Sequence, residues 1–422
     1  MMPSAWTSTS TGLTSNGLAS NGLASNGLAS NGLASNGPAS TWNDVAAMLG
    51  EDALAALARP VGEASALPNA CYTTEAWQRL EYERLFARSW FVAGFTQDVP
   101  NAGDVLPIEA AGMPLVILRD HNGRIRVFHN VCRHRGTVLV PERCSGQRLL
   151  TCPYHAWTYG LDGSLRTRPH FHGGDRHDTA PGPDAPGLFP VRTEVWHHWI
   201  FVNPDGKAPP LDDCLAPARA LIGDYDLSAT RYAGTVHFEA RANWKFALEN
   251  YIEPYHVFAA HPRLHAFVPM AERQPSRISD HIMWNCYRFR KAEAGRGAGL
   301  PHFPGLTDEA AHKWFWFILP TAFGFEVYPD HVASFHVTPL APDRCRERID
   351  IYLIGDAADS PDRAGQRQAV LDMWNDLNHE DIGLIEGLQK GRSSPLYDGG
   401  RLSPYWDAAP LHLARMIVEG MR

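Results

Sequence analysis

The chain has 422 residues, of which 44% are hydrophobic and 20% charged, so most of it can bury a core and wholesale disorder is excluded. The formal net charge of −8 argues against nucleic acid as a partner, because phosphate binding needs a basic surface. Seven cysteines are too few for a disulfide scaffold. The sequence contains no run of about 20 apolar residues, so we expect no membrane span. The first basic residue is Arg59, which fits neither a secretory nor a transit signal, so we expect a cytoplasmic protein.

The N-terminal segment differs in composition from the rest of the chain. Between residues 15 and 37, Ser-Asn-Gly recurs with a period of five residues. This period fits neither a helix nor a strand, and Asn-Gly pairs favour turns. We therefore predict a low-complexity flexible tail over residues 1–42. An amphipathic pattern then predicts an N-terminal helical segment over residues 43–88.

Short strands separated by turns predict an all-β domain over residues 89–204. Pro114–Leu118 is an apolar strand candidate. Asn122-Gly123 is a hairpin signal, and it precedes the alternating polar and apolar residues of Arg124–Phe128. The region thus has the features of a small antiparallel β domain.

The second part of the chain mixes helix and strand patterns. Helical periodicity appears at residues 243–260 and again from about Arg363 to Lys390. A strand-rich stretch covers residues 314–355, between the two helical regions. We therefore predict an α+β domain over residues 205–422.

Two Cys-plus-His pairs lie in the β domain. Cys132-Arg-His134 is followed, after seventeen residues, by Cys152-Pro-Tyr-His155. Such a set suits zinc, or a [2Fe–2S] cluster with two Cys on one iron and two His on the other. A zinc finger usually groups its Cys together and its His together, whereas here each segment supplies one of each, as in Rieske geometry. Histidine lacks the negative charge of thiolate, so the cluster would relay electrons at a raised potential.

A second group of ligand-type residues lies in the predicted helix at 243–260. Glu253 and His256 are on one face of that helix, and His261 follows five residues after His256. Pro262 should end the helix near His261 and let its side chain turn back, while Pro254 should kink the helix.

Two histidines need a third ligand to form the 2-His-1-carboxylate triad of non-haem Fe(II) oxygenases. Glu253 is the local candidate. The long C-terminal helix offers Asp381, which is distant in sequence.

These motifs together resemble the large (alpha) subunit of the Rieske non-haem iron oxygenases, the aromatic ring-hydroxylating dioxygenase family. The resemblance covers the chain from about residue 85 to its C-terminus. It rests on three segments, namely Phe128-His-Asn-Val-Cys-Arg-His-Arg-Gly136, Cys152-Pro-Tyr-His-Ala-Trp-Thr-Tyr159, and Glu253-x2-His256-x4-His261.

The resemblance implies two cofactors and the residues that hold them. The [2Fe–2S] cluster would be bound by Cys132, His134, Cys152 and His155. The mononuclear Fe(II) would be bound by His256, His261 and Asp381, with Glu380 as the alternative carboxylate. Glu253 stands where the family commonly has aspartate, and there it would bridge the cluster histidine of one subunit to the iron histidine of the next.

The implied fold is α+β, with a Rieske β domain followed by a helix-grip catalytic domain. The implied activity is that of a terminal oxygenase, which hydroxylates a small organic substrate with O₂. Its electrons would come from a separate NAD(P)H-dependent reductase, directly or through a ferredoxin, because the chain has no dinucleotide-binding fingerprint. The implied assembly is a head-to-tail homotrimer, since each iron would draw electrons from a neighbour's cluster.

Three functions remain open. The aromatic residues between Trp284 and Phe335 could line a slot for an arene that is hydroxylated on its ring. They could equally form a cage for a quaternary amine that undergoes oxidative N-demethylation, and glutamate at position 253 hints at this class. The third possibility is a zinc-binding interaction module without enzymatic activity.

Overall fold

The computed structural model describes residues 40–182 and 184–422, so the tail predicted over residues 1–42 lies almost wholly outside the described residues. Of the helices that are described, none is long and apolar enough to cross a membrane. The first described segment is helical, as the amphipathic pattern predicts. Its elements are α1 (Trp42–Leu49), α2 (Glu51–Leu57), α3 (Ala70–Thr73), α4 (Glu75–Leu80) and a π-helical turn at Glu81–Phe86.

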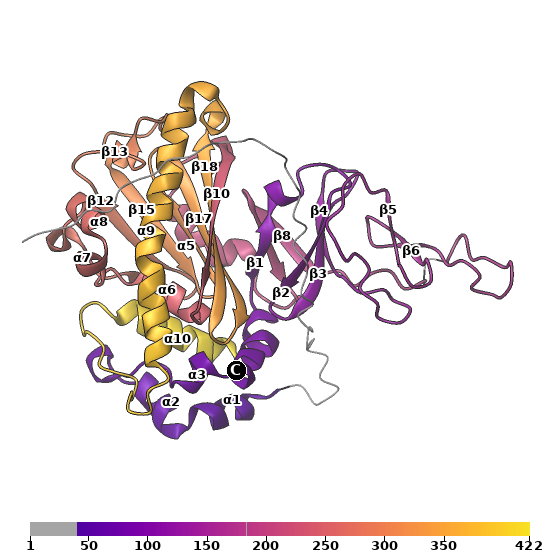
Figure 1. Ribbon diagram of the computed structural model, residues 1–422, viewed down its shortest axis with the longest axis horizontal. Helices are drawn as coiled ribbons and strands as arrows, with labels where there is room; N and C mark the ends of the chain where they lie inside the picture. Colours follow the sequence, from indigo (N-terminus) through magenta and orange to yellow (C-terminus); the bar gives the residue numbers. More distant parts are fainter. Residues whose placement is uncertain (1–39, 183) are drawn as a thin grey trace, which may run out of the picture. The chain divides into compact units, whose positions relative to one another are not determined.

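The next part of the chain consists of three small antiparallel sheets, most of whose strands are labelled in Figure 1. Their strands are β1 (Phe91–Phe95), β9 (Trp199–Asn203) and β8 (Arg192–Trp196); β2 (Val105–Ala110), β3 (Met113–Arg119) and β4 (Ile125–His129); and β5 (Leu149–Thr151), β6 (Thr158–Gly160) and β7 (Leu165–Thr167). The predicted hairpin joins β3 to β4, and Gly123 in its turn has a φ of +79°. The all-β fold expected here is confirmed.

The catalytic part is built on one antiparallel sheet of seven strands, which confirms the α+β prediction. In spatial order its strands are β10 (Thr230–Ala240), β18 (Arg344–Ile354), β17 (His331–Ala341), β16 (Phe323–Val327), β15 (Lys313–Leu319), β12 (Met283–Arg288) and β11 (Arg277–Ile278). The remaining elements are the strands β13 (Glu293–Ala294) and β14 (Gly297–Ala298) and the helices α5 (Leu211–Leu221), α6 (Trp244–Ile252), α7 (Val257–Ala260), α8 (Pro262–Phe267), α9 (Ala364–Gly391) and α10 (Ala408–Gly420).

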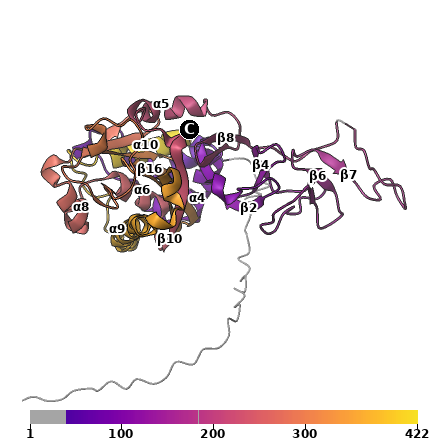
Figure 2. The same cartoon turned by 90° about the horizontal axis from the view of Figure 1, so that it is seen from above.

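Helices α6 and α9 carry the residues of the predicted iron site. They lie side by side against the seven-stranded sheet, as Figures 1 and 2 both show. The long helix predicted from Arg363 to Lys390 is confirmed as α9. Its contact with α6 brings segments more than one hundred residues apart in sequence to the same place.

The helix predicted over residues 243–260 is interrupted at Pro254, where the sequence analysis predicted only a kink. Helix α6 ends at Ile252, and Glu253 has an extended backbone with φ −99° and ψ 113°. The cause is Pro254, because a proline lacks the N–H of a helical bond and moves the residue before it away from helical angles. Glu253 and His256 therefore do not share a helix face. They are still in contact, because the backbone N–H of His256 donates to the Glu253 carboxylate at 3.3 Å.

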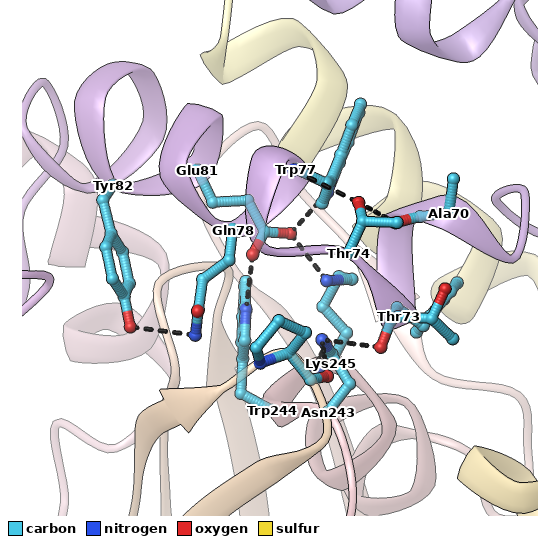
Figure 3. A network of polar contacts seen from close by, with 12 residues as sticks. Ala70, Thr73, Thr74, Trp77, Gln78, Glu81, Tyr82, Asn243, Trp244 and Lys245 are labelled. Atoms are coloured by element: carbon cyan, nitrogen blue, oxygen red, sulfur yellow. Dashed lines mark hydrogen bonds and ion pairs between the residues drawn. The ribbon is translucent and has the colours of Figure 1, made fainter. Parts of the chain in front are cut away.

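A buried ion pair fixes α6 to the N-terminal helical segment. The Lys245 ammonium donates to Glu81 Oε1 at 2.6 Å, and both side chains are 0% exposed. Figure 3 shows that the same carboxylate accepts the indole N–H groups of Trp77 and Trp244, each at 2.8 Å. Every charged atom in this group therefore has a polar partner, which is the condition for burying a charge.

Candidate metal centres and active site

The two predicted cluster segments are loops at one end of the β domain. The first follows β4, and the second connects β5 to β6. Nδ1 of His134 lies 3.1 Å from Nδ1 of His155, so the two imidazoles present the same nitrogen to one point. The Cys132 and Cys152 thiols also face each other, and burial together with this contact raises the pKa of Cys152.

This arrangement separates the two metal interpretations. A single tetrahedral zinc ion with bonds of about 2.0–2.3 Å would hold all four ligand atoms within roughly 4 Å of one another. In the described part of the chain, no three of the four cluster candidates bring their ligand atoms together at one point. A Cys pair and a His pair that stand apart match the two irons of a Rieske cluster instead. The geometry therefore does not favour the zinc-binding module.

His256, His261 and Asp381 do form a compact group. Nε2 of His256 lies 3.2 Å from Nε2 of His261, and Asp381 Oδ1 lies 3.0 Å from the latter and 3.6 Å from the former. Ligands at right angles on an ion with bonds of roughly 2.1 Å are about 3 Å apart. The distances between the three atoms thus fit a single ion such as Fe(II), which these residues would hold.

Glu380 and Asp381 contact different nitrogens of the same histidine. His261 Nδ1 donates to Glu380 Oε2 at 2.6 Å, whereas Asp381 lies beside Nε2. Burial of the imidazole opposes protonation, but the two carboxylates outweigh it and raise the pKa of His261. The same negative field favours a metal cation. Hydrogen bonding to Glu380 fixes the tautomer that leaves Nε2 free for that cation.

Glu253 orients the other histidine. Its Oε2 accepts from His256 Nδ1 at 3.1 Å, and its carboxylate also accepts the backbone N–H of Tyr255. Asn250 was not found from the sequence, and its Nδ2 donates to Asp381 Oδ1 at 2.8 Å. An asparagine two residues before the end of α6 carries no distinctive spacing, so only the tertiary contact with α9 reveals it.

A cavity adjoins the three candidate ligands, all of which contribute to its lining. Six of its lining side chains are aromatic, namely Tyr251, Trp314, Trp316, Tyr328, Phe335 and Trp374. The alternation of side chains along β15 and β16 explains which predicted aromatics take part, because Phe315, Phe323 and Phe325 point instead into a second core. The volume of the cavity is about 40 Å³, so its occupant is small or moves the walls apart.

Glu326 on β16 is the second residue that the sequence analysis missed. It lines the cavity and is 5% exposed. Burial raises the pKa of its carboxyl to about 8, against the influence of the Tyr251 and Tyr328 hydroxyls. The signal in the sequence was a single acidic residue within the apolar strand Phe323-Gly-Phe-Glu-Val327.

Comparison with known families matches both parts of the chain. Residues 89–178 match the Rieske [2Fe-2S] domain, and residues 227–422 match the ring hydroxylating alpha subunit (catalytic domain). Six copies of the GLTT repeat match residues 12–37, in the segment that lies outside the described residues.

Individual relatives extend over nearly the whole described chain. The oxygenase subunit of glycine betaine monooxygenase from Pseudomonas aeruginosa is 32% identical over 392 residues, which cover 84% of this chain and 89% of the relative. Chloroplastic choline monooxygenase from Atriplex hortensis is 27% identical over 352 residues, covering 81% and 75%. A crystal structure of a quaternary ammonium Rieske monooxygenase with an inhibitor superposes with a TM-score of 0.71 at 23% identity, covering 87% and 98%.

The paired loops of the β domain, the triad beside its cavity and these matches all agree. The cofactors of the family are a Rieske [2Fe–2S] cluster and a mononuclear iron, and the donor sets described above fit both. The chain belongs to the alpha subunits of the Rieske non-haem iron oxygenases, enzymes that hydroxylate a small organic substrate with O₂ and electrons from a separate reductase.

Proposed function

We propose that this oxygenase acts on a small quaternary ammonium compound. The observation that carries the proposal is the aromatic wall of the cavity beside the triad, because ring faces attract a trimethylammonium group by cation–π interaction. No lysine or arginine is among the described residues that line this cavity. The names of the relatives, which act on glycine betaine and choline, support the same class.

We further propose the role of each site residue. Cys132, His134, Cys152 and His155 hold the cluster. His256, His261 and Asp381 hold the Fe(II), while Glu380 acts on His261 without binding the metal. Glu253 holds His256 and, in a head-to-tail homotrimer, would connect it to His155 of a neighbouring subunit. A cytoplasmic location, a reductase with or without a ferredoxin, and the trimer itself belong to this proposal.

The side chains prepare the site for the reaction in three ways. Glu253 and Glu380 each hold the Nδ1 proton of a histidine, so that both Nε2 atoms face the same point. Asn250 fixes the orientation of the Asp381 carboxylate. The aromatic wall positions the substrate and excludes water. When bound, the cluster supplies single electrons and the Fe(II) activates O₂ for insertion into a C–H bond.

Ring hydroxylation is the second candidate, because an aromatic wall also stacks on an arene and the catalytic domain matches a ring-hydroxylating family. An engineered cavity that admits benzene has a volume of roughly 150 Å³. Either an arene or a trimethylammonium compound would therefore have to displace wall side chains, and the volume of the cavity does not separate the two candidates.

Product analysis separates the two candidates. The full chain, loaded with both cofactors, is supplied with a surrogate reductase, and O₂ uptake is followed with choline, glycine betaine, benzene and naphthalene. Hydroxylation of a carbon bound to quaternary nitrogen releases an aldehyde, whereas an arene gives a phenol or a diol. Substrate-dependent uptake with an aldehyde product supports the proposal. Uptake with arenes alone would reject it.

A further inference from the structure

The position of Glu326 is unusual for a carboxyl group. On β16, Phe325 and Val327 point into the second core, so Glu326 points to the opposite face of the sheet. There it is paired across the strands with Trp316, and both side chains line the cavity beside the triad. An acidic side chain that is 5% exposed is thus placed among aromatic rings.

Two other deeply buried carboxylates have cationic partners, whereas Glu347 on β18 accepts a hydrogen bond from the amide of Asn378. Glu81 is paired with Lys245, and Asp350 with Arg348. Among the described residues, no lysine or arginine nitrogen comes close enough to Glu326 for an ion pair. A buried carboxylate without a cation is costly, so either it keeps its proton or a cation must enter from the cavity.

Charged and titratable groups face Glu326 from several elements. Tyr251 on α6 and Tyr328 after β16 present their hydroxyls to its carboxyl. Two arginines lie close enough to lower the pKa of Glu326 by their charge, but neither forms an ion pair with it. Arg296 Nη1 donates to Glu293 at 2.5 Å, and Arg273 donates to the backbone carbonyls of Val268 and Leu264.

The open side of this carboxyl group is therefore the cavity, whose wall of aromatic rings suits the methyl groups of a quaternary ammonium ion. We propose that Glu326 is the specificity-determining residue of the site, which selects a positively charged head group over a neutral one of the same shape. The inference rests on the proposed function, and it identifies the residue that recognises the positive charge of the substrate. Glu326 does not touch the reacting carbon. Its carboxylate attracts the cation electrostatically, while the aromatic rings contact the methyl groups of the cation.

Two pairs of probes differ in charge but hardly in shape, because carbon replaces nitrogen. They are choline with 3,3-dimethyl-1-butanol, and glycine betaine with 3,3-dimethylbutanoate. Equilibrium dialysis against the full, cofactor-loaded chain under anaerobic conditions measures the binding of each probe without turnover. For the wild type, we expect the cation of at least one pair to bind roughly 10- to 100-fold more tightly than its neutral-headed counterpart.

The variant Glu326→Gln should reduce that ratio towards one and leave the binding of the neutral-headed probe unchanged. Glu239→Gln is the matched control, since it removes one negative charge from an exposed position on the same sheet and should keep the ratio. An unchanged ratio in Glu326→Gln would overturn the inference, and so would an equal loss of both probes, which indicates a structural role. Failure of the wild type to bind either cation, with turnover of arenes, would instead reject the proposed function itself.

The wild type gives a second test that does not depend on folding of a variant. Between pH 7 and pH 9, the affinity for the cation should rise as Glu326 ionises, whereas the affinity for the neutral-headed probe should stay constant. The tyrosines facing Glu326 have pKa values raised well above the usual value of 10, and the arginines stay protonated, so neither changes charge over this range. Equal pH dependence for both probes would contradict the inference.

Discussion

Asp381 and His261 approach each other at 3.0 Å through Oδ1 and Nε2, while the neighbouring Glu380 contacts the opposite nitrogen of the same ring. Two adjacent carboxylates thus have different functions. One is placed to bind the metal together with the imidazole, and the other is placed to orient the imidazole.

This difference predicts opposite outcomes for two substitutions. Asp381→Ala should lose most of the mononuclear iron, because only two ligands remain. Glu380→Gln should keep the iron but bind it about 10- to 100-fold more weakly, the usual cost of losing an outer partner. Iron per chain after gel filtration measures both effects, and the absorbance of the cluster is the internal control. Equal iron loss in the two variants would show that Asp381 and Glu380 contribute equally to metal binding. It would refute the proposal that only Asp381 binds the metal.

Glu253 leads to a prediction about electron delivery. Glu253→Gln should retain both metals, because no metal-binding atom is removed, yet slow the oxidation of the reduced cluster in a single turnover by roughly tenfold or more. The variant Glu249→Gln is the control, since Glu249 accepts a hydrogen bond from Tyr72 at 2.5 Å and does not contact the triad. Rapid-mixing absorbance at the cluster bands gives the rate. Wild-type kinetics in Glu253→Gln would exclude the bridging role.

The parts of the site that could be predicted from sequence are those that local spacing encodes. Cys132, His134, Cys152 and His155 occur in two short motifs, and the histidines at 256 and 261 are only five residues apart. Asp381 was one of two candidate carboxylates, with Glu253, until the family resemblance favoured it. The choice between Asp381 and Glu380 depends on how α9 is rotated against α6, which no local pattern specifies.

The residues that sequence analysis missed or misplaced depend on tertiary structure. Glu253 was expected on a helix kinked at Pro254, but the effect of Pro254 on the preceding residue ends the helix at Ile252. Asn250 and Glu326 become functional candidates only when strand β16 and helices α6 and α9 are packed around one cavity. Apolar periodicity predicts that a side chain is buried, but not which partner it meets.

Gly324 predicts a steric effect on the cavity. A Cβ at this position would lie 2.6 Å from Cε1 of Tyr251 and 2.9 Å from the backbone oxygen of Phe317. Gly324→Ala should therefore displace the Tyr251 ring, raise KM several-fold and destabilise the fold by ~1–3 kcal/mol. Gly387→Ala on α9 is the control, because its Cβ meets nothing within 4 Å and alanine favours a helix. Unchanged KM and stability in Gly324→Ala would show that the ring can move without cost.

The raised pKa of Glu326 predicts how stability depends on pH. The folded state keeps the proton up to about pH 8, whereas the unfolded state releases it near the ordinary value of 4.5. The unfolded state therefore binds fewer protons between these limits, so the contribution of Glu326 to stability is complete below about 4.5 and lost as pH rises through 8. Glu326→Gln should melt at a temperature that falls less steeply than that of the wild type between pH 5 and pH 8. Parallel melting curves would contradict the raised pKa.

The buried pair of Lys245 and Glu81 shows how burial changes the contribution of an ion pair to stability when its length stays the same. Lys313 and Glu309 form an ion pair of the same length, 2.6 Å, but their side chains are 32% and 65% exposed. Lys245→Met should destabilise the protein by ~3–5 kcal/mol, because it leaves the Glu81 carboxylate buried without its cation. Lys313→Met should cost at most ~1 kcal/mol, since water already screens that pair. Urea unfolding of both variants gives the two values, and similar losses would mean that the contact between α6 and the N-terminal helices does not depend on the buried charge.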